Sequence, residues 1–168
     1  ELSAYDKSKT LAERAAWDFV EGLPADRPLE LSVINPALVF GPLLEPDYGV
    51  SVNAIRKLMR KEYPGVPRLG WQTVDVRDVA SAHAAAMTTP GAAGQRFICG
   101  VDFVWMKEVA EILTRSFASE GYELPTRTLP NFVIRLAGLF DKATAVIVPR
   151  LGLECHLSNE KIKRVLGW

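Results

Sequence analysis

The hydrophobic pattern of the chain alternates between helix-like and strand-like segments. The stretch 5–21 contains no helix breaker, and small or apolar residues follow one of its faces, so it predicts a helix packed along that face. The next apolar run, 31–35, is nearly continuous, which is typical of a buried parallel strand. Pro36 has no N–H to donate to a ladder, and we expect the strand to end there.

The rest of the chain continues this alternation. The pattern predicts strands at 71–76, 96–99 and 126–129, and helices at 51–61, 78–87, 106–117 and 132–140. It also predicts a last helix that ends at Gly167. We expect the strands at 31–35 and 71–76 to lie in one parallel sheet. Ser51, Asp78 and Ser158 are candidate helix N-caps. Trp105, Phe132 and Phe140 are expected in the core.

Composition narrows the class of protein. The 168 residues are 48% hydrophobic, which is enough for one core, and the formal net charge is zero, which gives no support for a nucleic-acid or membrane partner. No run of apolar residues is long enough to predict a membrane span, so we expect a cytoplasmic protein. We expect Cys99 and Cys155 to be buried free thiols, His83 to be a packed residue, and no metal site.

Tyr5 and Lys9 are the candidate chemical groups. Their four-residue spacing places them one turn apart on the same helix face. An ammonium beside a phenol stabilises the phenolate, and such a phenol can protonate a carbonyl oxygen while hydride arrives at the carbon. Tyr and Lys are also ordinary on exposed helices, so the pair alone is a weak signal.

Three further blocks strengthen this interpretation. Asn35–Pro42 reads NPALVFGP, Thr73–His83 reads TVDVRDVASAH, and the chain finishes with Leu-Gly-Trp at 166–168. Together with the Tyr-x-x-x-Lys pair, and in this order, these blocks resemble the extended short-chain dehydrogenase/reductase family. The resemblance implies an α/β fold, namely the C-terminal part of a Rossmann-type doubly wound parallel sheet with a smaller α/β substrate domain.

The resemblance also implies roles for particular residues. Tyr5 is the catalytic acid, and Lys9 assists it and hydrogen-bonds the nicotinamide ribose, so both also bind the cofactor. The remaining cofactor-binding residues implied by the family's pattern pack on the nicotinamide, and they are Pro36, Ala37, Leu38 and Val39.

The segment 34–44 resembles the dihydroflavonol-reductase-like branch, whose members are NADPH-dependent reductases of ketones and aldehydes. This implies NADP as the cofactor, with NAD possible, and a small carbonyl compound as the substrate. NAD-dependent nucleotide-sugar epimerases and dehydratases are the alternative, although they more often carry Tyr where this chain has Phe40. A non-catalytic nucleotide sensor on the same fold is a further alternative, against which the presence of both Tyr5 and Lys9 argues.

Two elements of the family's pattern are not found in these 168 residues, namely the Gly-rich phosphate loop and a catalytic Ser upstream of Tyr5. We therefore expect the chain to be the C-terminal half of a longer reductase and to be inactive alone. Residues 1–42 and 71–99 are expected to belong to the nucleotide-binding domain, and 43–70 and 100–168 to the substrate domain. The resemblance also implies a homodimer formed through the helix 5–21.

Overall fold

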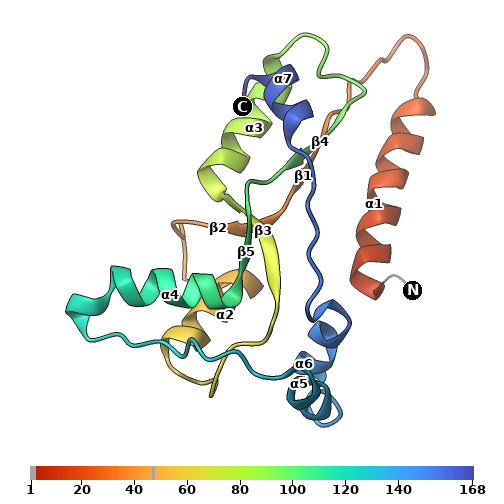
Figure 1. Cartoon of the computed structure of the whole chain (residues 1–168). Coiled ribbons are helices and arrows are strands. Elements are labelled where there is room, and N and C mark those ends of the chain that lie inside the picture. The colour runs from red at the N-terminus through yellow and green to blue at the C-terminus, as the bar shows by residue number, and fades with distance from the viewer. Residues whose placement is uncertain (1–2, 47) are drawn as a thin grey trace. The chain divides into compact units, whose positions relative to one another are not determined.

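The computed structural model describes residues 3–46 and 48–168. It contains the α-helices α1 (Ala4–Glu21), α2 (Val50–Met59), α3 (Val76–Thr88), α4 (Met106–Ser116), α5 (Asn131–Ala137), α6 (Lys142–Ile147) and α7 (Glu160–Leu166). The strands are β1 (Val33–Pro36), β2 (Leu38–Phe40), β3 (Gly70–Asp75), β4 (Arg96–Cys99) and β5 (Phe103–Trp105), and two short 3-10 helices lie at Ala118–Glu120 and Val148–Arg150. The predicted α/β class is confirmed (Figure 1).

The chain divides into two compact units. Unit 1 comprises 1–35, 78–99 and 158–168, and unit 2 comprises 36–77 and 100–157. These units differ from the predicted domains at 36–42, 71–77 and 158–168. None of the helices in the described part of the chain combines the length and the hydrophobicity that a membrane-spanning helix needs.

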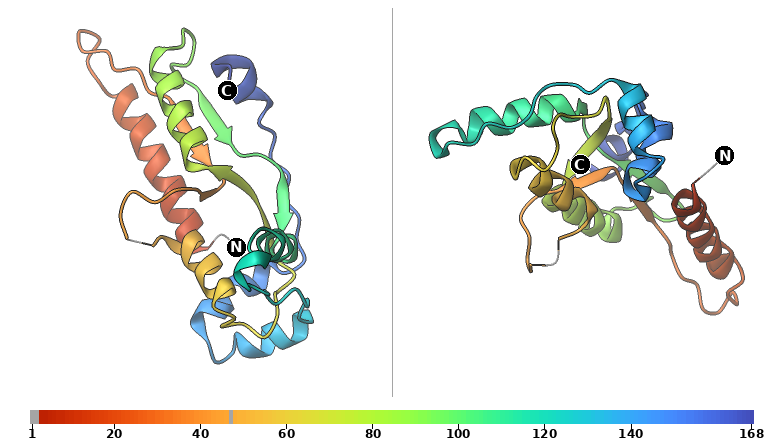
Figure 2. Two further views of the ribbon diagram at one scale, coloured as in Figure 1. Left: turned by 90° about the vertical axis from the view of Figure 1, so that its left-hand side faces the viewer. Right: turned by 90° about the horizontal axis from the view of Figure 1, so that it is seen from below.

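Unit 1 is built on the pairing of β1 with β4. Helices α3 and α7 lie beside β4 in Figure 1 and Figure 2, and the fully buried side chains of Phe97, Cys99 and Ile162 form the core between these elements. The last residue of the chain secures this packing, because the indole Nε1 of Trp168 donates to the carbonyl oxygen of Asp78 at 2.9 Å. The final helix ends, as predicted, at a left-handed Gly167 with φ +66°.

Helix α1 contacts the rest of unit 1 through one side. Glu13 and Trp17 are half-buried there, and the Glu13 carboxylate accepts two hydrogen bonds from the Arg96 guanidinium on β4, at 2.7 and 3.0 Å. Arg96 therefore lowers the pKa of Glu13 below its ordinary value of 4.5. Of the small and apolar residues predicted to form the packed face, Ala16 and Val20 are half-buried, whereas Ala12 and Phe19 are exposed, so that expectation holds only in part.

Unit 2 contains a three-stranded sheet in the order β2-β3-β5. Strand β2 runs parallel to β3, with Val39 opposite Val74, and β5 runs antiparallel to β3. Helices α2 and α4 pack together through the buried side chains of Leu58, Met106 and Ala110. Contrary to expectation, β1 and β3 lie in different sheets among the described residues, because the chain leaves the β1–β4 ladder at Pro36 and a separate short strand, β2, pairs with β3.

Three predicted helix caps and one predicted strand need correction. Helix α3 begins two residues before Asp78, because the Asp75 carboxylate accepts from the backbone N–H of Arg77 at 2.8 Å and so takes the capping role. Ser158 does accept from the N–H of Glu160, but the residue at the cap position is Asn159. Ser51 lies inside α2, and its hydroxyl donates to the carbonyl oxygen of Val39 instead of capping the helix. The segment 126–129 forms only an isolated bridge, between Val66 and Thr128.

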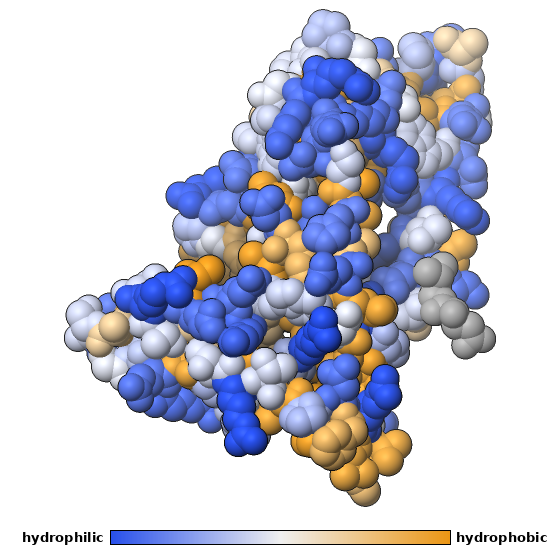
Figure 3. Space-filling model, viewed as in Figure 1, coloured by the Kyte–Doolittle hydropathy of each residue, from blue (hydrophilic) through white to orange (hydrophobic). Residues whose placement is uncertain are grey.

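The end of unit 2 formed by α5 and α6 carries an exposed apolar surface, visible as the orange patch over these helices in Figure 3. Phe132 is 70% exposed and Phe140 86% exposed, so the expectation that both lie in the core is wrong here. The buried side chain of α5 is Ile134. The predicted helix 132–140 is also shorter than expected, because α5 ends at Ala137 and Phe140 lies in the turn that follows.

Candidate active site

Tyr5 and Lys9 lie together on the first turns of α1. The Lys9 Nζ atom is 5.6 Å from the centre of the Tyr5 ring, within the range of a cation–π contact. The Tyr5 side chain is 68% exposed, and Lys9 is exposed as well. The two predicted catalytic groups are therefore adjacent and accessible to a ligand.

Ser3 fixes the turn that carries Tyr5. Its hydroxyl accepts from the backbone N–H of Asp6 at 3.1 Å and donates to the Asp6 carboxylate at 2.7 Å, which caps α1. This cap was not among the predicted ones, although a Ser followed three residues later by an acidic residue is a common helix start.

Pro36, Ala37, Leu38 and Val39 form a continuous path from β1 into β2. Pro36 ends β1 and is exposed, whereas the other three are half-buried. Leu38 and Val39 are held in register with Thr73 and Val74 of β3. All four belong to unit 2, while Tyr5 and Lys9 belong to unit 1.

Glycines allow the backbone to approach this path closely on two sides. A Cβ at position 100 would lie 2.9 Å from the Cβ of Ala37, too close for an ordinary contact. Gly41 has φ +135°, which other residues rarely adopt, and a Cβ there would lie 2.7 Å from a methyl carbon of Val76. Next to it, Arg77 lowers the pKa of Asp75 to about 2 through two side-chain hydrogen bonds.

A groove of about 430 Å³ begins in unit 2 where this path ends. Phe40 and Gly41 line it together with side chains of α2 and α4, among them Val52, Ile55 and Ile112. Among the described residues that line it, Thr73 alone carries a hydroxyl and none is charged, so the groove is suited to an apolar group.

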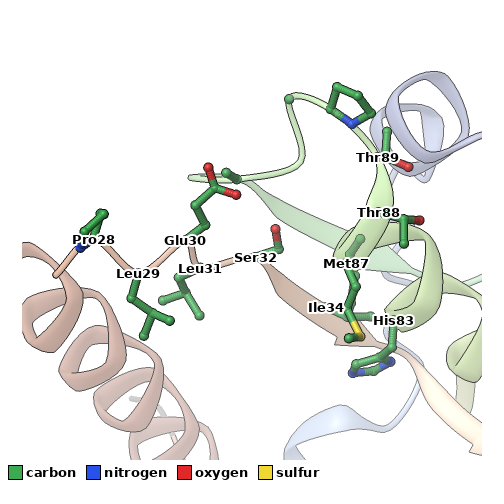
Figure 4. A pocket seen from close by; sticks show the side chains of 14 residues that line it. Pro28, Leu29, Glu30, Leu31, Ser32, Ile34, His83, Met87, Thr88 and Thr89 are labelled. Carbon is green, nitrogen blue, oxygen red and sulfur yellow. The ribbon is translucent and has the colours of Figure 1, made fainter.

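A larger groove, of about 730 Å³, lies in unit 1 between the segment 28–34 and the end of α3. Figure 4 shows the side chains of Met87 and His83 near Ile34 along its wall. None of the predicted site residues lines it. His83 was expected to be packed, but it is exposed, and its Nδ1 lies 2.8 Å from the carbonyl oxygen of Val79 one helical turn earlier.

The cysteines and the possible metal ligands were also predicted from the sequence. Both cysteines are free, as expected; Cys99 is buried, which raises the pKa of its thiol, but Cys155 is exposed, contrary to expectation. Within residues 3–46 and 48–168, no three His, Cys, Asp or Glu side chains are placed to ligate a metal ion.

Comparisons with known proteins relate this chain to carbonyl reductases. It is 36% identical to cinnamoyl-CoA reductase 2 of Medicago truncatula over 123 residues, which cover 73% of this chain and 34% of the relative. It is 34% identical to the NADPH-dependent methylglyoxal reductase GRE2 of Saccharomyces cerevisiae over 122 residues, covering 69% of this chain and 36% of the relative. No family model matches the chain.

A solved structure shows the same fold. The crystal structure of yeast methylglyoxal/isovaleraldehyde reductase Gre2 with NADPH superposes with a TM-score of 0.70 at 29% identity, covering 95% of this chain and 48% of that one. The chain thus spans about a third of the length of these curated relatives and about half of the solved structure.

Proposed function

Because this chain belongs to the extended short-chain dehydrogenase/reductase family, we propose that it contributes catalytic and nicotinamide-contacting residues to an NADPH-dependent reductase of ketones or aldehydes. The proposal applies to the full-length protein. The observation that carries it is the Tyr5–Lys9 pair, which lies on one turn of a capped helix and is open to a ligand.

The residues present fit this cofactor and this chemistry. NADPH, when bound, supplies hydride to the carbonyl carbon of the substrate. The Tyr5 hydroxyl donates the proton that the carbonyl oxygen takes up, and the Lys9 ammonium stabilises the phenolate left behind. Lys9 also donates to a ribose hydroxyl of the cofactor. No acid–base group is present in the side chains of Pro36, Ala37, Leu38 and Val39. Their role is therefore to make van der Waals contacts with the nicotinamide.

The proposal extends to the organisation of the full-length protein. Residues 1–42 and 71–99 belong to its nucleotide-binding domain, and 43–70 and 100–168 to its substrate domain. A second copy covers the outer side of α1 in a homodimer. The side chains of Leu11 and Phe19 on α1 are 51% and 64% exposed and are therefore available for this contact.

The direct test of the function follows isotope transfer. The full-length protein is incubated with NADPH deuterated at C4 of the nicotinamide and a panel of aldehydes and ketones. We expect a deuterated alcohol and one NADP⁺ for each alcohol formed. Conversion of a nucleotide sugar to its epimer without net consumption of cofactor would instead indicate an epimerase, and cofactor binding without turnover of either substrate class would indicate a sensor.

A further inference from the structure

The Ser51 hydroxyl makes an unexpected hydrogen bond. Ser51 lies in the first turn of α2, where a serine commonly bonds to the free N–H groups of its own helix. Instead its Oγ donates to the carbonyl oxygen of Val39 at 2.7 Å, across twelve residues of sequence, and the bond is half-buried. The N-cap of α2, Gly49, provides no side-chain bond in its place.

This bond acts near the end of a short edge segment of sheet. Ala37 is held by its close approach to Gly100, and β2 is held by the register of Leu38, Val39 and Phe40 with β3. Directly after Phe40 the chain reaches Gly41, which has a permissive backbone, and then an exposed loop in which Leu44 is fully open to solvent. In the described part of its sheet, β2 is also an edge strand, with one neighbour, β3.

We propose that Ser51 is a positioning residue, whose hydroxyl holds the Val39 peptide in place against the nicotinamide and ties the start of α2 to the end of β2. This inference rests on the proposed function, because it takes Val39 as a cofactor contact. Ser51 itself touches neither cofactor nor substrate. It acts through the backbone of Val39, and a displacement of about 1 Å at a reacting centre can slow a reaction as much as a hundredfold.

Three variants of the full-length protein test this role. Ser51→Ala removes the hydroxyl, Ser51→Thr retains it, and Ser81→Ala is the matched control, because the Ser81 hydroxyl bonds to Asp78 inside α3 at 2.9 Å and is exposed. For Ser51→Ala we expect kcat to fall about tenfold and the KM for NADPH to rise several-fold. The KM for the carbonyl substrate and the melting temperature should change little, Ser51→Thr should recover most of the activity, and Ser81→Ala should behave as wild type.

Hydrogen–deuterium exchange without cofactor provides a readout that is independent of catalysis. Peptides covering 38–46 should exchange faster in Ser51→Ala than in wild type or Ser81→Ala. Unchanged exchange in these peptides, or a loss of activity that only follows a lower melting temperature, would overturn the inference. If exchange accelerates but wild type reduces no carbonyl compound, the hydroxyl does hold the segment and the proposed function is what fails.

Discussion

Replacing Tyr5 by Phe should reduce the rate of carbonyl reduction by about 10²–10⁴-fold and leave NADPH binding nearly unchanged. The change removes one hydroxyl from a side chain that is 68% exposed, so it creates no cavity and little loss of stability is expected. What is lost is the proton donor, and general acid catalysis contributes a factor of about this size. The measurement is kcat with saturating NADPH, together with the dissociation constant of NADPH from titration.

Tyr122→Phe is the matched control for this variant. Tyr122 is also partly exposed and lies outside the predicted site. Its ring packs edge-on against Phe117, with 6.1 Å between the two ring centres. It should retain the wild-type rate. A Tyr5→Phe protein that reduces carbonyl compounds at nearly the wild-type rate would show that the role assigned to Tyr5 is wrong.

Lys9→Ala should impair both catalysis and cofactor binding. The ammonium lies 5.6 Å from the Tyr5 ring centre and is proposed to contact the ribose as well, so its removal affects two steps. We expect kcat to fall about 10²-fold or more, as for loss of acid–base assistance, and the dissociation constant of NADPH to rise about tenfold, as for loss of one charge-assisted hydrogen bond.

Lys7→Ala serves as the control, because Lys7 is exposed on the same helix but two residues away, and so points in another direction. It should leave both quantities near their wild-type values. NADPH affinity that is unchanged in Lys9→Ala would remove the ribose contact from the account, and an unchanged kcat would remove the assistance to Tyr5.

The sequence was most informative where structure depends on local chemistry. The helix carrying Tyr5 and Lys9 forms because no breaker interrupts it, and β1 ends at Pro36 because proline cannot donate to a ladder. The last helix ends at Gly167 because glycine readily adopts the left-handed conformation found there. The proximity of Tyr5 and Lys9 follows from helix periodicity alone.

The failed predictions concern competition between alternatives that the pattern cannot rank. The hydroxyl of Ser51 could cap its own helix or bond to a distant carbonyl, and only the tertiary fold brings Val39 within reach. Asp75 and Asp78 are both plausible caps, and the bond from Arg77 N–H selects the first. For Phe132, helical spacing shows which residues share a face but not what covers it, and the pattern did not reveal that α5 ends before Phe140.

The most direct test of the central claim is a structure of the full-length protein with NADPH. We expect Pro36, Ala37, Leu38 and Val39 to lie within van der Waals distance of the nicotinamide. The Lys9 ammonium should hydrogen-bond the ribose, and the Tyr5 hydroxyl should face the C4 side of the ring. A nicotinamide more than about 8 Å from the stretch Pro36–Val39, beyond any direct contact, would contradict the claim.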